Sequence, residues 1–199
     1  EDPNVMTNEN LPFMGVIETK LQSGILCRIA RISFSGEMAF EIYTLSDYAV
    51  AMMDMLWREV QAVDGCLYGL EALGALRIEK GHVTAAEIDG RVTIDDAGLG
   101  RMASTKKSYI GSAMRTRGVL NNEDREKLVG IFPKDQKETF DAGAILCRPD
   151  KVKGFGVGRI TSVTHSPALG HWIGLGLIQG GHEPWKGKTL VAADPVRNK

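Results

Sequence analysis

The sequence has no apolar run long enough to cross a membrane as a helix. Such a helix needs roughly 20 consecutive apolar residues, and no stretch of the 199 residues approaches that length. An excess of one charge sign is also missing, because 24 Lys and Arg stand against 25 Asp and Glu, for a net charge of −1. An almost neutral chain offers no electrostatic basis for binding nucleic acid. We therefore expect neither a membrane nor a nucleic-acid partner.

Cysteine is scarce and is never paired in sequence. The three cysteines, Cys27, Cys66 and Cys147, are far apart, and no C-x-x-C motif occurs. This pattern argues against a zinc site and against a disulfide framework, so we expect a reducing, cytoplasmic compartment. The histidines do not fall at metal-ligand spacings, and we predict no metal site. They are His82, His165, His171 and His182.

Motifs for nucleotides and for activated nucleophiles are absent as well. Residues 154–158 read GFGVG without the G-x-G-x-x-G spacing, and the RITSV that follows is typical of a strand. We predict a glycine-rich strand with close backbone approach there, and no flavin or nicotinamide site in this chain. A loop is predicted at 161–170. Its His165 has no triad partner at a known spacing, so we favour a turn at the edge of a ligand cleft over acid–base catalysis.

The most informative stretch that is present runs from Cys27 to Thr44 and reads CRIARISFSGEMAFEIYT. It predicts two strands joined by a tight turn at residues 35–36. Over residues 37–44 the apolar side chains alternate with the others, which places Glu41 and Tyr43 together on the non-core face.

An ionised Glu on such a face suits a flat ligand with two adjacent N–H donors, because its two oxygens accept parallel hydrogen bonds. Tyr43 would line the same site. The alternative is that Glu41 is a solvated surface residue and that Tyr43 only packs.

The rest of the chain predicts helices followed by short strands. Ser46 is a plausible N-cap for a helix over 47–63, and a second helix over 69–80 ends at Gly81. In the first helix the apolar side chains at helical spacing are expected to face the core. They are Val50, Met53, Leu56, Trp57 and Val60.

After a polar stretch at 121–126, apolar segments alternate with Gly and Pro, as in a small antiparallel barrel. These segments cover 127–133, 142–147, 154–163, 172–179 and 187–194. We expect an α+β fold, with a mixed sheet and packed helices in domain 1–122 and an antiparallel β-barrel in domain 123–199. Asp95 and Asp96 are expected at the N-terminus of a short helix.

Four blocks in chain order resemble the aminomethyltransferase (glycine-cleavage T-protein) superfamily. Residues 34–43 resemble its F-S-G-E-x-x-F-E-I/V-Y stretch, and residues 69–81 resemble its helix ending in L-R-x-E-x-G. Residues 88–100 are similar to its D-x-x-x-T-P-x-x-x-G-L segment, and residues 161–170 to its T-S-x-x-x-S-P-x-L-G loop. The resemblance spans nearly the whole chain and implies the aminomethyltransferase-like folate-binding fold.

Within the superfamily, three segments resemble the C-terminal region of sarcosine oxidase alpha subunits. They are PFMGVIE at 12–18, ALRIEKG at 75–81 and TKKSYIG at 105–111. The glycine-cleavage enzyme typically carries A-R-D-S-L-R in the helix, whereas this chain has Leu73 at the position of the folate-contacting Arg. The chain also begins with a polar run and no Met. From the resemblance we expect the C-terminal part of a longer subunit.

The resemblance implies roles for particular residues. Glu41 matches the acidic residue that binds the pterin ring of folate, Tyr43 would line that site, and Arg77 would meet the carboxylate tail. A structural ion pair is the alternative for Arg77. The catalytic Asp of the family is expected upstream of this sequence, so no catalytic residue is assigned.

The resemblance also implies tetrahydrofolate as the cofactor of this domain, with FAD or FMN and NAD elsewhere in the full enzyme. The implied partners are the other sarcosine oxidase subunits, including the flavin-bearing beta subunit. The implied function is to help capture the one-carbon unit from sarcosine oxidation as 5,10-methylenetetrahydrofolate. Two alternatives stay open: a stand-alone folate-dependent aminomethyltransferase or demethylase, and a degenerate domain that mediates subunit contacts.

Overall fold

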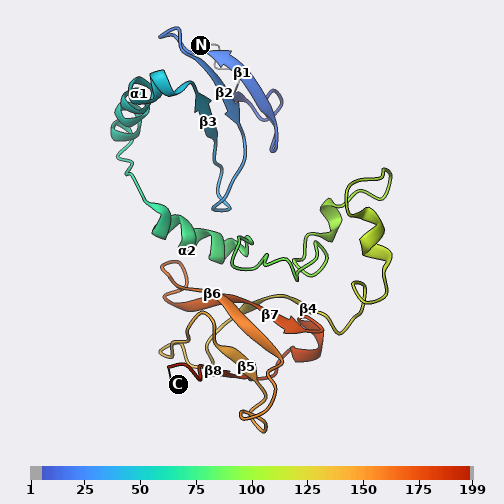
Figure 1. The fold of residues 1–199 in the computed structure, drawn as a ribbon. Helices are drawn as coiled ribbons and strands as arrows, with labels where there is room; N and C mark the ends of the chain where they lie inside the picture. The colour runs from blue at the N-terminus through green and yellow to red at the C-terminus, as the bar shows by residue number, and fades with distance from the viewer. Residues whose placement is uncertain (1–5, 198–199) are drawn as a thin grey trace. The chain divides into compact units, whose positions relative to one another are not determined.

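The computed structural model describes residues 6–197 of the chain, which fall into two compact units (Figure 1). The N-terminal unit covers residues 1–76 and the C-terminal unit covers residues 77–199. Residues 1–5 and 198–199, which begin and end the two domains expected from the sequence, lie outside the described residues. Within 6–197, no helix has both the length and the apolar character needed to cross a membrane.

In its described residues the N-terminal unit contains a three-stranded antiparallel sheet, a helix packed on it and the first part of a second helix. The strands are β1 (Val16–Lys20), β2 (Leu26–Ala30) and β3 (Glu41–Thr44), in the order β1-β2-β3. In β2, Cys27 and Ile29 are buried while Arg28 is exposed, as a strand with one covered face requires. The two buried side chains pack with Met52 of the helix α1 (Ala49–Ala62), so this helix covers that face of the sheet.

The tight hairpin predicted around residues 35–36 is wrong. Residues 31–40 form an irregular connection, and β3 begins only at Glu41. Inside this connection the Ser33 hydroxyl accepts the backbone N–H of Gly36 at 2.9 Å, and the Ser35 hydroxyl accepts that of Glu37. Side chains that bind backbone donors in this way compete with strand pairing, which explains the shorter strand.

The first helix also differs from the prediction. Residues 46–48 form a single 3-10 turn, and Ser46 does not cap the α-helix, which begins at Ala49. The helix buries Met52, with Met55 partly buried. Of the five residues expected to face the core, two are partly buried and three are exposed: the first are Trp57 and Val60, and the others are Val50, Met53 and Leu56. The sequence AVAMMDMLW carries apolar side chains around most of the helix, so spacing alone did not identify the buried side.

The second helix, α2 (Leu70–Lys80), agrees with the prediction for 69–80. Gly81 has a φ of +77°, a conformation open to glycine, and its N–H and that of His82 bind carbonyl groups of the last helical turn. In the C-terminal unit, Ile78 of this helix packs against Ile173 and Leu175.

Five antiparallel strands form the sheet of the C-terminal unit, in the order β4-β7-β6-β5-β8. They are β4 (Glu126–Ile131), β5 (Ile145–Cys147), β6 (Gly158–Ser166), β7 (His171–Gln179) and β8 (Val191–Ala193). Each falls within or next to a segment predicted from the sequence. The α+β class is confirmed, and the sheet is barrel-like, although its order runs from β4 to β8 without closing.

The long pair β6 and β7 contains one irregularity. Ile160 pairs with Gly176 and Ser162 pairs with Leu175, so Thr161 is an extra residue on β6. Such a β-bulge locally changes the direction of the side chains. Before the bulge, Ile160 is 1% exposed and lies in a core cluster with Leu146 and Ile178.

The glycine-rich segment 154–158 is not a strand, since β6 begins only at Gly158, but the close backbone approach predicted for it is found at Gly158. A Cβ atom there would lie 2.4 Å from the carbonyl oxygen of Leu177 and 2.9 Å from Cα of Ile178. We expect Gly158→Ala to destabilise the C-terminal unit by about 1–3 kcal/mol, because backbone atoms must move apart. Thermal melting would measure the loss. The matched control is Gly118→Ala, where a Cβ meets no atom within 4 Å, and equal melting temperatures for the two variants would contradict the prediction.

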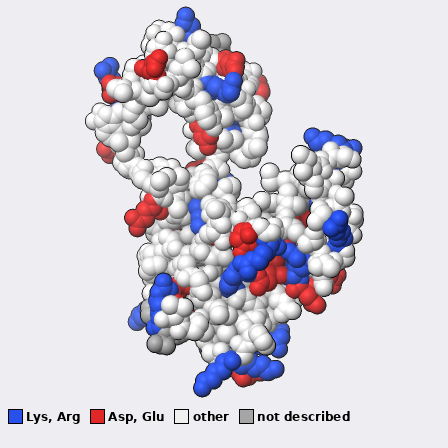
Figure 2. Space-filling model, in the orientation of Figure 1, with Lys and Arg blue, Asp and Glu red and all other residues white. Residues whose placement is uncertain are grey.

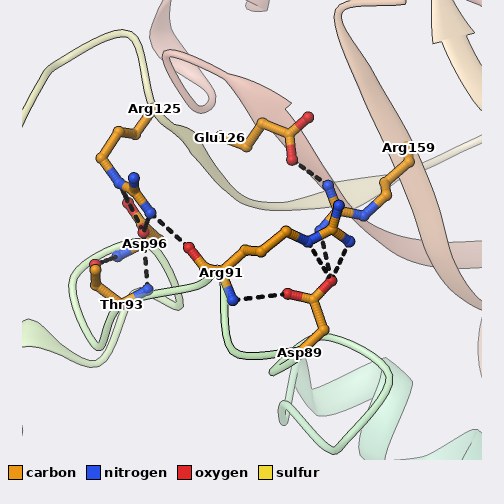
Figure 3. A network of polar contacts seen from close by, with 7 residues as sticks. All are labelled: Asp89, Arg91, Thr93, Asp96, Arg125, Glu126 and Arg159. Carbon is orange, nitrogen blue, oxygen red and sulfur yellow. Dashed lines mark hydrogen bonds and ion pairs between the residues drawn. The ribbon is translucent and has the colours of Figure 1, made fainter. Parts of the chain in front are cut away.

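Polar contacts fasten the segment after α2 to the sheet (Figure 3). Asp96 is buried and accepts hydrogen bonds from Arg125 at 2.6 Å and from the backbone N–H of Thr93 at 2.8 Å. Arg159 of β6 contacts Asp89 in the same segment. The short helix expected at the two aspartates is instead a single turn over residues 94–98. Reciprocal hydrogen bonds between Thr93 and Asp96 open this turn, and Gly98, with a φ of +74°, ends it.

Candidate functional site

Glu41 and Tyr43 lie on the same face of β3, as the alternation in the sequence predicted. They are two residues apart on the strand, and both side chains are exposed. The Tyr43 hydroxyl donates a hydrogen bond to the Glu41 carboxylate. A carboxylate offers about four lone-pair positions, so Glu41 keeps the capacity to accept two further N–H donors.

The contact with Glu41 raises the pKa of Tyr43 above its ordinary value. The hydrogen bond to the carboxylate is the main cause, with smaller contributions from desolvation and from the negative charge. The phenol therefore stays protonated at neutral pH and continues to donate. Its hydrogen bond fixes one carboxylate oxygen of Glu41 and thereby orients the other.

Arg28 is a neighbour of this pair that the sequence reasoning missed. It lies opposite Tyr43 across the β2–β3 pairing, and its guanidinium binds Glu18 of β1 at 2.6 Å. Arg28, Glu18 and Tyr43 border an open depression of about 590 Å³, whereas Glu41 is not among the residues that line it. The register of β2 against β3 places Arg28 opposite Tyr43. The sequence alone does not give this register, so Arg28 could not be identified from it.

Arg77 lies in the C-terminal unit and is 8% exposed. Its Nη1 donates to Glu87 Oε2 at 3.0 Å, and its Nη2 donates to the Ser162 hydroxyl at 2.6 Å. The ion pair that the sequence left open as an alternative is therefore present. A contact between Arg77 and a folate tail stays a prediction.

Glu87, the partner of Arg77, is 1% exposed and was not singled out from the sequence. Its carboxylate also lies within hydrogen-bond distance of the Thr84, Thr161 and Ser162 hydroxyls. Burial alone would raise the pKa of Glu87. The hydrogen bonds, together with the positive charge of Arg77, outweigh this effect and hold the pKa below its ordinary value.

The segment 161–170 is not the loop that the sequence predicted. Residues 161–166 belong to β6, and only 167–170 form a turn before β7. His165 packs edge-on against the Trp172 ring. The Ser166 hydroxyl binds the Glu79 carboxylate of α2. These side chains act in packing and in fastening the helix. Among residues 6–197, no three His, Cys, Asp or Glu side chains gather as metal ligands.

Two protein-family models match this sequence, one in its N-terminal part and one in its C-terminal part. The model of the GCVT N-terminal domain matches residues 2–107, and the model of the glycine cleavage T-protein C-terminal barrel domain matches residues 126–194. Both matches agree with the superfamily resemblance found in the sequence.

The sequence is similar both to sarcosine oxidase alpha subunits and to aminomethyltransferases. The sarcosine oxidase alpha subunit of Rhizobium meliloti is 36% identical over 189 residues, covering 90% of this chain and 19% of that protein. An aminomethyltransferase of Desulfitobacterium hafniense is 34% identical over 163 residues, covering 78% of this chain and 41% of that protein. The chain thus spans about a fifth of the first relative and less than half of the second.

One solved structure supports the fold. The glycine cleavage system aminomethyltransferase T of Bartonella henselae superposes with a TM-score of 0.76 at 24% identity. The superposition covers 97% of this chain and 50% of that one.

Proposed function

The chain belongs to the glycine-cleavage T-protein family, and on that basis we propose that it binds tetrahydrofolate as the C-terminal part of a sarcosine oxidase alpha subunit. The relationship to sarcosine oxidase alpha subunits, at 36% identity over 90% of this chain, supports the oxidase context. Leu73, at a position where the glycine-cleavage enzyme has Arg, supports the same choice over a stand-alone aminomethyltransferase.

The observation that carries the proposal is the exposed carboxylate of Glu41. In the proposed complex its two oxygens accept the 2-amino and N3 hydrogens of the pterin ring, since one carboxylate matches two adjacent N–H donors. The residues fit this role because Glu41 is accessible and retains acceptor capacity beyond its bond to Tyr43. Tyr43 holds the carboxylate in place. Arg77 stays in the proposal as a contact for the folate tail, although both its terminal nitrogens have protein partners.

Bound tetrahydrofolate supplies nucleophilic nitrogens, so that the one-carbon unit from sarcosine oxidation is recovered as 5,10-methylenetetrahydrofolate. The contribution of this chain is to bind and orient the acceptor close to the source of a reactive one-carbon unit, which limits its loss to water. The proposal places the flavin, the NAD and the oxidation itself on other parts of the enzyme. We also propose that the protein is cytoplasmic and that its two domains span residues 1–122 and 123–199.

Replacing Glu41 tests the proposal directly. We expect Glu41→Ala to weaken tetrahydrofolate binding by about 1.5–3 kcal/mol, the range for losing a charged hydrogen-bond partner. Calorimetric titration of the chain, and of the intact oxidase, would measure the change. In the intact enzyme, flavin-dependent oxidation of sarcosine should proceed at its normal rate.

The matched control is Glu37→Ala, which removes an exposed carboxylate from the adjoining connection. It should leave the folate affinity unchanged. Equal affinity of the Glu41→Ala variant and the unaltered protein would refute the assignment of the pterin to β3. Failure of the unaltered intact enzyme to bind folate would favour a purely structural domain. Folate-dependent aminomethyl transfer without a flavin partner would favour a stand-alone transferase.

A further inference from the structure

The glycine-rich segment singled out in the sequence belongs to the loop that joins β5 to β6. This loop, residues 148–157, lies within the C-terminal unit (Figure 1). Its base is fixed to the sheet, because the N–H of Val157 donates to the carbonyl of Leu146 at 2.7 Å. Two turns lie inside the loop, and each is closed by a backbone hydrogen bond, one from Lys151 and one from Gly154. The loop therefore has a defined shape on a fixed base.

Phe155 lies in this loop between two glycines, with its whole side chain in water. It is 101% exposed, as much as in an unfolded chain, and Val152 of the same loop is 41% exposed. The neighbouring Gly156 lies close to β5, since a Cβ atom there would overlap Cγ2 of Ile145. Single exposed apolar side chains are common on protein surfaces, so the meaning of Phe155 depends on what surrounds it.

Basic side chains gather on this loop and on the nearby segment 183–188, and we call the two segments together the basic surface. They contain five basic and two acidic side chains, for a net charge of +3. Within residues 6–197, none of the five basic side chains takes part in an ion pair. Figure 2 shows blue side chains over the loop that Figure 1 draws below β5. The five are Arg148, Lys151, Lys153, Lys186 and Lys188.

Trp185 joins the two segments of the basic surface. The guanidinium of Arg148 lies 5.4 Å from the centre of the Trp185 ring, and the ammonium of Lys188 lies 5.5 Å from it. The face of an aromatic ring attracts cations at such distances. The ring itself is held in place, because its N–H donates to the Gln179 carbonyl at 2.7 Å and it packs against the core of the sheet. Two of the five charges therefore have defined positions beside the loop.

We propose that the basic surface docks a protein partner that carries an apolar pocket bordered by carboxylates. Phe155 enters the pocket, and the lysines around it face the carboxylates. Protein interfaces commonly place aromatic anchors at their centre and polar or charged residues at their rim. Opposite charges on the two partners then select the correct pairing. The partner is another subunit of the oxidase, and this identification rests on the proposed function.

The apolar content of the basic surface favours a protein partner over a lipid membrane. A membrane stabilises a basic surface whose apolar side chains enter it together. Among the large apolar side chains of the two segments, only Phe155 is fully exposed. Trp185 is held on its own unit, with its N–H already bound. One exposed ring matches one pocket, and carboxylates around that pocket would complement the positive charge.

Assembly of the intact oxidase tests the proposal. We expect the alpha subunit with the triple change Lys151→Gln/Lys153→Gln/Phe155→Ala to bind the other subunits roughly tenfold more weakly, because an aromatic anchor carries much of an interface's binding energy. Sedimentation of the mixed subunits would measure the affinity. In 0.5 M salt the unaltered subunit should lose more affinity than the variant, since exposed charges are screened.

The matched control removes the same groups from another exposed segment of the C-terminal unit. It is Phe132→Ala/Lys134→Gln/Lys137→Gln, and it should assemble normally. An equal loss of affinity in both triple variants, or no loss in either, would overturn the proposal.

A second measurement needs no variant. Oxidative labelling of Phe155 should be strong in the separated alpha subunit and weak in the assembled enzyme. Equal labelling in the two states would overturn the proposal.

Three further outcomes separate the other occupants and the proposed function. Binding of the alpha subunit to phosphatidylserine vesicles, lost in the triple variant of the basic surface, would indicate a membrane and overturn the proposal. Dimerisation of the alpha subunit, lost in the same variant, would indicate a second copy and overturn it as well. If that variant assembles normally while Glu41→Ala weakens folate binding, the proposed function stands and this inference fails. If folate does not bind while the variant fails to assemble, the folate proposal fails and this inference stands.

Discussion

Replacing Glu87 with alanine should destabilise the C-terminal unit by about 3–5 kcal/mol, as expected when one partner of a buried ion pair is removed. The carboxylate is 1% exposed, and its partner Arg77 is 8% exposed. The alanine would leave the Arg77 guanidinium buried without a counter-charge. It would also remove the carboxylate that accepts from the buried Ser162 hydroxyl, whereas the Thr161 hydroxyl could still donate to the Leu175 carbonyl. Both effects destabilise the folded state, so both lower the free energy of unfolding.

Hydrogen exchange of the β6 and β7 amides would measure this loss, since it reports the free energy of opening that pair of strands. Glu126→Ala is the matched control. Glu126 also pairs with an arginine, Arg159, but both side chains are partly exposed, so its loss should cost no more than about 1 kcal/mol. Similar losses for the two variants would show that Glu87 is not the central acceptor.

The same carboxylate makes stability depend on pH. The pKa of Glu87 is lower in the folded state than its ordinary value of 4.5, so its contribution is complete above that value. Its contribution is lost as the pH falls through the folded-state pKa. The protein should therefore lose stability on acidification below pH 4.5, and the Glu87→Ala variant should lose less. Parallel losses in the two proteins would assign the acid sensitivity to other carboxylates.

Truncating Ile160 should cost about 2–5 kcal/mol, the range for deleting a fully buried aliphatic side chain. Ile160 is 1% exposed and packs with Leu146, Val157 and Ile178 in the core of the sheet. Ile160→Ala would leave a cavity that two paired strands cannot easily close. Urea unfolding followed by the fluorescence of Trp172, on the neighbouring strand, would measure the change.

Ile110→Ala makes the same chemical change at a fully exposed position. It should alter stability by less than about 0.5 kcal/mol. A comparable loss at both positions would mean that the C-terminal unit is not held by the cluster around Ile160.

Local patterns in the sequence predicted the parts of the fold that local physics determines. The strands of the C-terminal unit follow apolar segments between turns, and α2 ends at Lys80, directly before the Gly81 that was predicted to stop it. The hairpin at residues 35–36 was wrong because serine hydroxyls took the backbone donors. The buried side of α1 was predicted only in part, because apolar residues lie around most of the helix: Trp57 and Val60 are partly buried, whereas the buried Met52 was not among the residues expected to face the core.

For the candidate site, short-range geometry was again the part that could be predicted. The period of a strand placed Glu41 and Tyr43 on one face, and the structure agrees. The surroundings of Arg77 depend on Glu87 and Ser162, and Ser162 is 85 residues away along the chain. No local pattern reports a contact of that span. Arg77 and Glu87 are ionisable residues that can be read in the sequence, but that they pair with each other is known only from the folded structure.

The bulge at Thr161 has a consequence for how β6 is aligned. In a regular strand, successive side chains point to opposite faces, so two neighbouring hydroxyls could not share one acceptor. The extra residue lets both Thr161 and Ser162 reach Oε1 of Glu87, at 2.8 and 2.5 Å. If β6 slipped by one position along β7, its side chains would change faces, and the buried carboxylate would lose these donors. The hydrogen bonds of these two hydroxyls to Glu87 thus favour the observed register of β6 against β7 over registers shifted by one residue.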